Sequence, residues 1–415
     1  MTILDCQQVK IEKKRIALLG GTFDPPHWGH VQIAKAALQA LPQLSEVIFV
    51  PAGLPALKNI RSMTPSVYRY QMTKLLVREL PHCRVSDLEV SRPGPSYTLT
   101  TVKYFLNRVA DRNDLYFVAG YDVLFDLPRW HKPGELLQSC TLLIGTRPGY
   151  PLPELMQQKK FLEENFQARI LLFEMEPQPA SSTAIRDLFN RPQATATPAM
   201  LDPLLPRSVA DFCRQYELYQ TDLFPPDLPT SVLEQFFLYQ QKMWFEMSFG
   251  RLLHSVSTAM LALRLALRFK VDPAAALLSG LLHDLAKEKD GRSWLAQHPA
   301  EAYWLQDHPP VIHGAHGAEL AQAWGLTDPE ALAAIRYHTT LRAGATDLEK
   351  IIFLADKIEY GRTYQDLEPI RRAAEHNLDE AVRLCLASVI KVMQRRRERP
   401  HPFSLAALQE LQKQL

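Results

Sequence analysis

Cysteine is scarce and scattered in this 415-residue chain. No two cysteines have the Cys-x-x-Cys spacing, and the five of them are Cys6, Cys83, Cys140, Cys213 and Cys385. This distribution argues against a disulfide framework or a zinc ribbon, and it is typical of a reducing compartment. We therefore expect a cytoplasmic protein.

Long apolar runs and an excess of one charge are also missing. Charged residues precede the first apolar run, so the N-terminus does not resemble a signal peptide, and no stretch approaches the ~18 uncharged apolar residues of a membrane span. The formal net charge is only +2, and we interpret Arg395–Arg397 as a solvated helix end. We expect neither a membrane nor a nucleic-acid partner, and we leave a homo-oligomer open.

The length and composition favour two ordinary globular domains, with 47% hydrophobic and 22% charged residues. In the first half, amphipathic stretches such as Val31–Leu41 and Tyr68–Leu80 separate short apolar runs. The runs are Arg15–Leu19, Val47–Val50, Leu115–Val118, Thr141–Ile144 and Arg169–Phe173. Strands that alternate with helices predict an α/β, Rossmann-like domain with a parallel sheet, which binds its ligands at the carboxyl ends of the strands.

A proline-rich stretch around Tyr219–Pro229 interrupts this pattern, and its three prolines indicate a stiff connector. Beyond it the periodicity is helical, as in Leu252–Phe269, Pro273–Lys287, Pro329–His338 and Leu348–Tyr360. We predict an α/β domain over residues 1–220, a linker over 221–230 and an all-α domain over 231–415.

The run GGTFDPPHWGH, from Gly20 to His30, directly follows the first apolar strand. Gly20 and Gly21 permit a tight turn and close approach of a ligand. His27 and His30 share one face of the helix that follows, whose free N–H groups favour an anion. The pattern predicts a phosphate-binding turn.

His27-Trp28-Gly29-His30 resembles the HxGH motif of the nucleotidyltransferase superfamily, and the longer string resembles bacterial nicotinate-mononucleotide adenylyltransferases. The resemblance extends in order to about Tyr219. It includes the strings VPAG (50–53), SYT (96–98), GYD (120–122), LPRW (127–130), RPGY (147–150) and SSTAIR (181–186). Leu57 replaces a histidine and Tyr121 an alanine of the family pattern.

The resemblance implies that AMP passes from ATP to nicotinate mononucleotide, forming deamido-NAD and pyrophosphate in NAD biosynthesis, with Mg²⁺ bridging the phosphates. It assigns phosphate neutralisation to His27, His30, Lys58 and Arg186. It assigns ATP binding to Gly20, Gly21, Thr22, Phe23, His30, Gly120, Asp122, Ser182, Thr183 and Arg186. It assigns the mononucleotide to Ser96, Tyr97, Thr98, Trp130 and Arg147.

A second group of ionisable residues interrupts apolar helical faces in the C-terminal half: His254, His283, Asp284, His313, His338 and Asp356. Such residues are costly inside a helical core unless they are paired or bind a metal. Their order, H…HD…H…H…D, resembles the HD phosphohydrolase superfamily. Three strings resemble the YqeK-type branch of this superfamily: LLHDLAK (281–287), IRYHTT (335–340) and FLAD (353–356). Members of that branch are symmetrical diadenosine tetraphosphate hydrolases that yield ADP.

This second resemblance implies a hydrolase site with two transition metals, of which we favour iron over manganese. His254, His283 and Asp356 are assigned to one ion, His313 and His338 to the other, and Asp284 bridges them. A bridging water would attack phosphorus. We name Asp284 and Lys287 as catalytic, and Lys287 with Arg336 as supports for the polyphosphate. His308 and His316 are the rival ligands.

Other functions fit the same residues. The first half could use nicotinamide mononucleotide, or another phosphorylated acceptor, instead of nicotinate mononucleotide. The second half could hydrolyse another nucleotide, or it could be a non-catalytic regulatory domain. Assays with both mononucleotides, metal analysis and a panel of nucleotides separate these alternatives.

Overall fold

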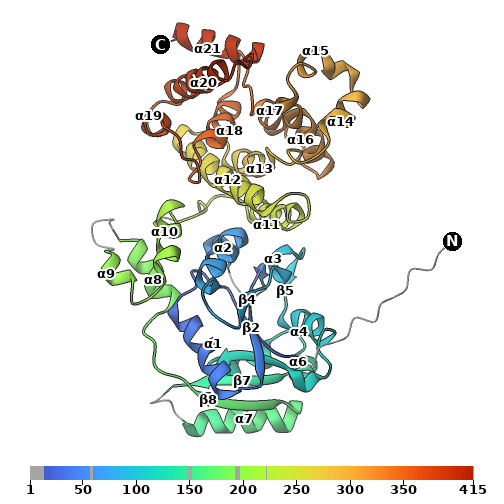
Figure 1. Cartoon of the computed structure of the whole chain (residues 1–415), viewed down its shortest axis with the longest axis vertical. Coiled ribbons are helices and arrows are strands. Elements are labelled where there is room, and N and C mark those ends of the chain that lie inside the picture. The colour runs from blue at the N-terminus through green and yellow to red at the C-terminus, as the bar shows by residue number, and fades with distance from the viewer. Residues whose placement is uncertain (1–13, 57–58, 148–151, 192–196, 221, 415) are drawn as a thin grey trace, which may run out of the picture. The chain divides into compact units, whose positions relative to one another are not determined.

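The computed structural model describes residues 14–56, 59–147, 152–191, 197–220 and 222–414. It divides into two compact units, one formed by Met1–Asn59 and Tyr68–Thr221 and the other by Ile60–Val67 and Asp222–Leu415 (Figure 1). The sequence gives no sign that residues 60–67 group with the second unit. Within that unit the 3-10 turn η1 (Ile60–Ser62) packs on α11 (Thr230–Met243), and the Arg61 guanidinium donates to the carbonyl oxygens of Pro225 and Leu228 at 2.6 and 2.8 Å.

The first unit is built on a six-stranded sheet in the order β4-β2-β1-β6-β7-β8, in which every neighbouring pair is parallel. Its strands are β1 (Arg15–Gly21), β2 (Leu44–Pro51), β4 (Cys83–Val85), β6 (Leu115–Gly120), β7 (Thr141–Thr146) and β8 (Arg169–Glu174). A separate small pair joins β3 (Leu54–Pro55) to β5 (Pro95–Ser96). The α/β prediction with a parallel sheet is therefore confirmed, and the short β4 is the one strand of this sheet that the apolar runs did not indicate.

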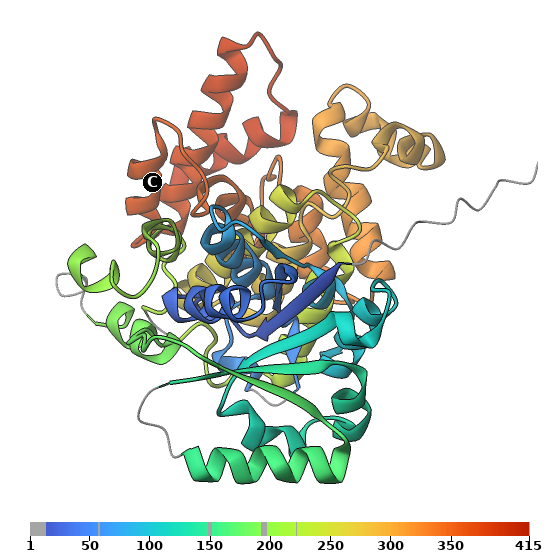
Figure 2. The same ribbon diagram turned by 60° about the horizontal axis from the view of Figure 1, so that its bottom comes forward.

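Helices cover both faces of the sheet, as Figures 1 and 2 show. The helices of this unit are α1 (Trp28–Ala40), α2 (Ser66–Val77), α3 (Leu88–Ser91), α4 (Thr98–Leu106), α5 (Val123–Asp126), α6 (Pro133–Ser139), α7 (Leu152–Phe166), α8 (Ser182–Phe189), α9 (Pro198–Leu201) and α10 (Arg207–Gln215). Alternate strand residues such as Ile16, Leu18, Phe117 and Ile144 share a buried core with α4, α6 and α7, while α1 packs on the opposite face. Burial on both faces explains why the inner strands β1, β2, β6 and β7 are continuous apolar runs.

The strand order reverses between β1 and β6, which lie side by side and turn outward to opposite halves of the sheet. Ligands of doubly wound sheets bind at the carboxyl ends of the strands at such a switch point. Gly20 and Gly21 end β1, and Gly120 ends β6. The fold thus places the phosphate-binding turn and the GYD string at the expected edge.

The second unit is helical, and the described part of residues 222–414 contains no strand. Its helices are α11 (Thr230–Met243), α12 (Phe249–Phe269), α13 (Pro273–Leu282), α14 (Gly291–Gln297), α15 (Ala302–Leu305), α16 (Ile312–Ala323), α17 (Pro329–Tyr337), α18 (Asp347–Ile358), α19 (Leu367–Ala374), α20 (Leu378–Arg395) and α21 (Pro402–Gln414). The helical prediction for this half is confirmed. It extended α13 too far, because the helix ends at Leu282 and residues 283–288 form turns.

Two glycines bring the site-bearing helices close together. A Cβ on Gly280 would lie 2.9 Å from Ala259 Cα, so α13 packs directly on α12. A Cβ on Gly314 would lie 2.5 Å from the carbonyl oxygen of Arg336, so α16 lies against α17. These contacts hold residues from four helices at the short range that a shared site requires.

One described helix, α12, is long and apolar enough by length and composition to cross a membrane, although the sequence reading found no such stretch. In this structure 67% of its most apolar 18-residue window is buried, and it packs on α13 and α18. α12 also carries Arg251 and His254 of the site described below. It is a core helix of the second unit.

Candidate active sites

The two histidines of the first motif cap the helix on which they lie. His27 is the N-cap of α1, and its Nδ1 accepts the backbone N–H of Gly29 at 3.1 Å. His30 Nδ1 in turn accepts the backbone N–H of His27 at 3.2 Å, which completes a capping box. Because Nδ1 accepts in both rings, the proton of each neutral ring lies on Nε2, the nitrogen that can donate to a phosphate oxygen.

Burial, together with the positive charge of Arg147, lowers the pKa of His27 to about 4. The ring is therefore neutral at pH 7 and offers a hydrogen bond without a full charge. Positive potential at this turn comes instead from the start of α1 and from Arg147, which follows β7.

Gly29, the glycine of the HxGH string, is required by this geometry. A Cβ there would lie 2.9 Å from both Cε1 and Nδ1 of the His27 ring and 3.3 Å from the carbonyl oxygen of Ala180. Glycine at this position thus lets the capping imidazole close over the first turn of α1.

Gly29→Ala should displace the His27 ring and lower kcat/KM for adenylyl transfer by ~10- to 100-fold, since a shift of about 1 Å has that effect. The fold should be retained because alanine favours a helix. Steady-state kinetics and a thermal melt check this. Gly134→Ala is the matched control, because Gly134 is also the second residue of its helix and its Cβ would meet only Phe166 at 3.8 Å. Equal kinetics for the two variants would contradict the assignment.

The second nucleotide string meets the first in space. Ser181 caps α8 by accepting the N–H of Ala184 at 3.2 Å. Ser182 Oγ donates to the carbonyl oxygen of Pro25 at 2.9 Å, and Arg186 Nη1 donates to that of Asp24 at 2.8 Å. Arg186 also contacts Thr183 Oγ1 at 3.3 Å. The structure thus brings residues 181–186 against the loop that precedes His27, and the starts of α1 and α8 lie at one place.

A cavity of about 300 Å³ opens beside this turn. Of the residues that the sequence assigned to ligands, those that line it are Gly20, Gly21, Thr22, Ser96, Tyr97, Thr98 and Trp130. Trp130 packs edge-on against Phe117, and the Tyr97 ring lies 4.5 Å from the His131 ring. An aromatic-walled cavity next to a phosphate-binding turn is suited to a planar base or pyridine ring.

The remaining predicted residues lie at different depths. The Phe23 side chain is buried against His30 and Phe49, so it can face a ligand only through its backbone. Asp122 is exposed, and a Cβ on Gly120 would meet its Oδ1 at 2.6 Å. Tyr121 packs on the hydrophobic core instead of lining the cavity. Lys58 and Leu57 lie outside the described residues.

Sequence reasoning missed two buried charged residues near this cavity. Arg69 is fully buried and donates to backbone carbonyls of the loops after β1 and β2. Glu89 lines the cavity and accepts the Thr101 hydroxyl at 2.5 Å. Burial raises the pKa of Glu89, although hydrogen bonds from Thr101 and Ser96 oppose this. Their burial is visible only in the structure, and no spacing in the sequence distinguishes them.

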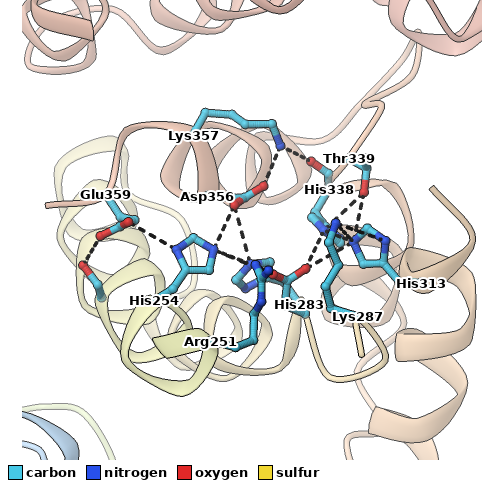
Figure 3. Close-up of polar contacts among 12 residues, drawn as sticks. Arg251, His254, His283, Lys287, His313, His338, Thr339, Asp356, Lys357 and Glu359 are labelled. Atoms are coloured by element: carbon cyan, nitrogen blue, oxygen red, sulfur yellow. Dashed lines mark hydrogen bonds and ion pairs between the residues drawn. The ribbon is translucent and has the colours of Figure 1, made fainter. Parts of the chain in front are cut away.

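In the second site the four predicted histidine ligands lie around Asp284. The sixth predicted ligand, Asp356, contacts His254 and His283. His254 lies on α12, His283 and Asp284 follow α13, His313 lies on α16, His338 ends α17 and Asp356 lies on α18. Figure 3 shows His254 and Asp356 on one side, His313 and His338 on the other, and His283 between them.

The ligand atoms form two groups that share Asp284. On one side His254 Nε2 lies 3.0 Å from Asp356 Oδ1 and 3.3 Å from His283 Nε2, and Asp284 Oδ2 lies 3.6 Å from His283 Nε2. On the other side Asp284 Oδ1 lies 3.2 Å from His313 Nε2 and 3.6 Å from His338 Nε2. Each carboxylate oxygen of Asp284 thus faces a different group.

These distances fit a metal centre. A metal about 2.1 Å from each imidazole nitrogen holds neighbouring ligands about 3 Å apart. His313 Nε2 and His338 Nε2 lie 3.0 Å apart. His254, His283 and Asp356 each have one ligand atom within 4.8 Å of the others. The same holds for His283, Asp284 and His338. The residues present therefore suit divalent cations held by mixed imidazole and carboxylate ligands.

The protonation states of both carboxylates, His313 and His338 also suit metal binding. His254 differs, because burial would lower its pKa but hydrogen bonds to Asp356 and Glu359 raise it. Burial alone would raise the pKa of Asp284, but the surrounding histidines hold it well below its usual range. Burial would likewise raise the pKa of Asp356, but Lys357 and the hydrogen bond from His254 hold it well below its usual range. Burial lowers the pKa of His338 to about 3. Ionised carboxylates and neutral imidazoles are the forms that bind metal at neutral pH.

Outer partners orient three of the imidazoles. The Nδ1 of His283 and of His338 face the carbonyl oxygens of Gly280 and Ile335 at 2.8 and 2.7 Å. The Nδ1 of His254 faces Glu359 Oε1 at 3.2 Å. Donation from Nδ1 leaves the Nε2 lone pair for the centre. Glu359, one turn after Asp356, was not predicted from the sequence.

Glu359→Gln should lower metal affinity by ~10- to 100-fold, as loss of an outer-shell partner does. Glu359 also accepts Ser257 Oγ and the N–H of Gly361, each at 2.6 Å, so its carboxylate is fixed. Titration against a coloured chelator measures the affinity. Glu349→Gln on the same helix is the control, because Glu349 is fully buried but pairs with Arg342. Equal affinity in the two variants would show that Glu359 has no role in the centre.

Four cationic side chains contact the ligands. Arg251 Nη1 lies 2.7 Å from Asp284 Oδ2, and Lys287 Nζ lies 3.2 Å from His313 Nε2. Lys357 Nζ and Arg362 Nη2 lie 2.6 and 2.8 Å from the two oxygens of Asp356. We call these four residues the cationic rim. Lys287, one of the two residues predicted to steady the polyphosphate, belongs to the cationic rim.

Arg336, the other predicted support, lies elsewhere. Its guanidinium pairs with Glu301 and lies over the Trp304 ring at 5.5 Å. Arg336 therefore does not contact the groups around Asp284 in this structure, and its support of the polyphosphate stays a prediction. The rival ligand His316 stacks on Trp294, and His308 contacts the ring of His401, so neither joins the groups around Asp284.

Together the fold and the sites define a nucleotidyltransferase-type α/β domain joined to a helical domain of the HD type. The cytidylyltransferase-like family matches residues 18–188, and the HD domain family matches residues 251–361. The chain is 33% identical over 209 residues to a Clostridium botulinum protein named "Probable nicotinate-nucleotide adenylyltransferase", covering 50% of this chain and 100% of that one. A Moorella thermoacetica protein of the same name is 36% identical over 211 residues, covering 50% and 93%. The chain therefore belongs to the nicotinate-nucleotide adenylyltransferase family through its N-terminal half and carries an HD domain in its C-terminal half.

Two solved structures are also similar. One, from Clostridium acetobutylicum, is described as a "predicted HD superfamily hydrolase involved in NAD metabolism"; it is 30% identical, with a TM-score of 0.41, and covers 42% of this chain and 96% of that one. The other is Plasmodium falciparum nicotinic acid mononucleotide adenylyltransferase complexed with NaAD, 19% identical with a TM-score of 0.41, covering 51% and 100%.

Proposed function

We propose that the N-terminal half transfers AMP from ATP to nicotinate mononucleotide and so forms deamido-NAD. The meeting of residues 181–186 with the capped start of α1, at the switch point of the sheet, carries this proposal. The name of the curated relatives supports the same acceptor.

In the proposed reaction, a 5′-phosphate oxygen of the mononucleotide forms a bond to the α-phosphorus of ATP while the bond to the β-phosphate breaks and pyrophosphate leaves. Catalysis is positioning and charge stabilisation, since the substrate supplies the nucleophile. His27 and His30 donate from Nε2 to phosphate oxygens, and Arg186 and Lys58 supply positive charge. Bound Mg²⁺ would neutralise the phosphates further. Ser96–Thr98 and Trp130 hold the pyridine ring in the cavity.

Incubation with MgATP and either nicotinate or nicotinamide mononucleotide tests this function. We expect a higher kcat/KM with nicotinate mononucleotide. A higher kcat/KM with nicotinamide mononucleotide would change the proposed acceptor but keep the adenylyl-transfer reaction. No dinucleotide from either acceptor would reject the function.

We propose that the C-terminal half is a two-metal hydrolase that cleaves diadenosine tetraphosphate symmetrically to two ADP. The position of Asp284, with one oxygen toward each ligand group, carries this proposal. We assign His254, His283 and Asp356 to one ion and His313 and His338 to the other, and we favour iron. Bound cations would acidify the attacking water.

The charge of the site favours a polyphosphate. Asp284, Asp356 and Glu359 are carboxylates, and the cationic rim offsets their charge before any metal binds. With cations bound to Asp284 and Asp356, the rim side chains become available for substrate oxygens. A chain of several phosphates meets this excess of positive charge better than a monophosphate.

Metal analysis of the purified chain and hydrolysis of a nucleotide panel test this proposal. We expect a transition metal and ADP as the product from diadenosine tetraphosphate. ATP and AMP as products would mean asymmetrical cleavage of the same substrate, and a preference for nucleoside triphosphates would change the substrate; either result keeps a hydrolase. A metal-free domain with no hydrolysis would favour the regulatory alternative.

A further inference from the structure

Arg69 on α2 is a buried cation that the proposed transfer has not used. Its side chain is 0% exposed. Nη1 donates to the carbonyl oxygens of Thr22 at 2.8 Å and Ala52 at 2.6 Å, and Nη2 donates to that of Gly53 at 2.8 Å. A buried guanidinium is costly unless its donors are satisfied, so its presence here calls for a reason beyond packing.

The three acceptors belong to two different ligand loops. Thr22 follows β1 and lines the cavity beside the phosphate-binding turn. Ala52 and Gly53 follow β2, and Ala52 lines the same cavity. Arg69 thus links the loops that follow two neighbouring strands by hydrogen bonds to their backbone carbonyls. An apolar side chain has no donor for these carbonyls.

The link continues toward the predicted pyridine loop. Gly53 N–H donates to Ser96 Oγ at 3.0 Å. The Arg69 bond to the Gly53 carbonyl and the Gly53 bond to Ser96 fix opposite sides of one residue. A single guanidinium therefore bears on the turn after β1, the loop after β2 and, through Gly53, on Ser96. Hydrogen bonds in such a chain polarise and strengthen one another.

We propose that Arg69 is a positioning residue. It fixes the turn after β1 relative to the loop after β2 and, through Gly53, relative to the Ser96–Thr98 loop. This inference rests on the proposed adenylyl transfer. Arg69 contacts neither substrate; it acts through the backbone of Thr22, Ala52 and Gly53. The fixed fork of a guanidinium meets three carbonyls at once, a geometry that lysine reproduces only in part.

Arg69→Met tests the role, because methionine fills a similar volume without a donor. We expect kcat/KM for transfer to fall by roughly 100-fold, since loosening both loops misplaces the reacting groups. The KM for ATP and that for the mononucleotide should both rise. Arg69→Lys should recover only part of the activity, to about a tenth of the wild-type value, because lysine keeps the charge but reproduces only part of the hydrogen bonding.

Met72→Ala is the matched control for lost packing. Met72 is also fully buried on α2, and its sulfur lies 3.5 Å from Cys213 Sγ, away from the ligand loops. We expect it to lower the melting temperature while both KM values remain within twofold of wild type. Hydrogen exchange should be faster at Phe23 and Gly53 in Arg69→Met but not in Met72→Ala.

Calorimetric titration with MgATP separates this inference from the proposed function. If the wild-type chain binds ATP but transfers AMP to neither mononucleotide, the function fails, while weaker ATP binding in Arg69→Met still supports the positioning role. If Arg69→Met folds and keeps wild-type ATP affinity, exchange rates and KM values, the inference is overturned. It is equally overturned if Arg69→Met and Met72→Ala lose affinity in parallel with stability. Should Arg69→Met fail to fold, the same comparison is made with Arg69→Lys, whose unchanged ATP affinity and exchange rates would also overturn the role.

Discussion

Asp284→Asn is expected to remove the metal-dependent hydrolysis of diadenosine tetraphosphate and to leave adenylyl transfer unchanged. Asp284 is the residue that both ligand groups share, with Oδ1 near His313 and Oδ2 near His283. An outer-shell partner is worth ~10- to 100-fold in metal affinity, and loss of a shared direct ligand should exceed that. Metal content and ADP release measure the effect.

The control for this variant is Asp347→Asn, an exposed aspartate on α18 that pairs with Lys350. It should retain both metal and hydrolysis. If Asp284→Asn keeps its metal and its rate, the two groups do not share that ligand. If it loses metal but the wild-type chain never hydrolysed a nucleotide, the helical half is a metal-binding domain without this chemistry.

His30→Ala should have the opposite pattern, with transfer reduced by roughly 10²- to 10³-fold and hydrolysis unaffected. The loss of one preorganised donor to developing phosphate charge has about this effect. The fold should be kept, since the ring lies at the first turn of α1 and only half of the capping box is lost. Initial rates of dinucleotide formation and a thermal melt provide the measurement.

His82→Ala serves as the control for this change, because His82 is an exposed histidine of the same unit whose ring lies against the carbonyl oxygen of Ser45 at 3.2 Å. Its rate should equal that of the wild type. A wild-type rate in His30→Ala would reject the phosphate-binding role of the HxGH string.

The sequence was most informative where one physical requirement dominated. Strands buried on both faces must be apolar, so the inner strands β1, β2, β6 and β7 stood out. Of the two edge strands, β8 keeps the apolar run Ile170–Phe173 although Leu171 is exposed, whereas β4 has Cys83 and Arg84 and gave no such signal. The end of α13 was misplaced because the apolar period continues through Leu285 and Ala286, although turns form there. Patterns of hydrophobicity do not show where a helix ends.

The partners of the site residues were less visible. Arg69 bonds to backbone carbonyls, which have the same chemistry in every residue, so no spacing announces the contact. Arg251 and Arg362 have no distinguishing pattern in the sequence. The packing of α12 on α13 brings Arg251 to Asp284, and the turn after α18 returns Arg362 to Asp356, six residues earlier. Glu359 had a usable signal, because it follows Asp356 by three residues on one helical face.

The central claim is that one chain holds two phosphate-chemistry sites, one that forms an anhydride bond and one that cleaves one. Phosphorus NMR of the intact, metal-replete chain with MgATP, nicotinate mononucleotide and diadenosine tetraphosphate tests it directly. The account predicts deamido-NAD and pyrophosphate from the first pair of substrates and ADP from the tetraphosphate, in a single sample. Spectra in which no dinucleotide forms, or in which the tetraphosphate persists, would contradict it.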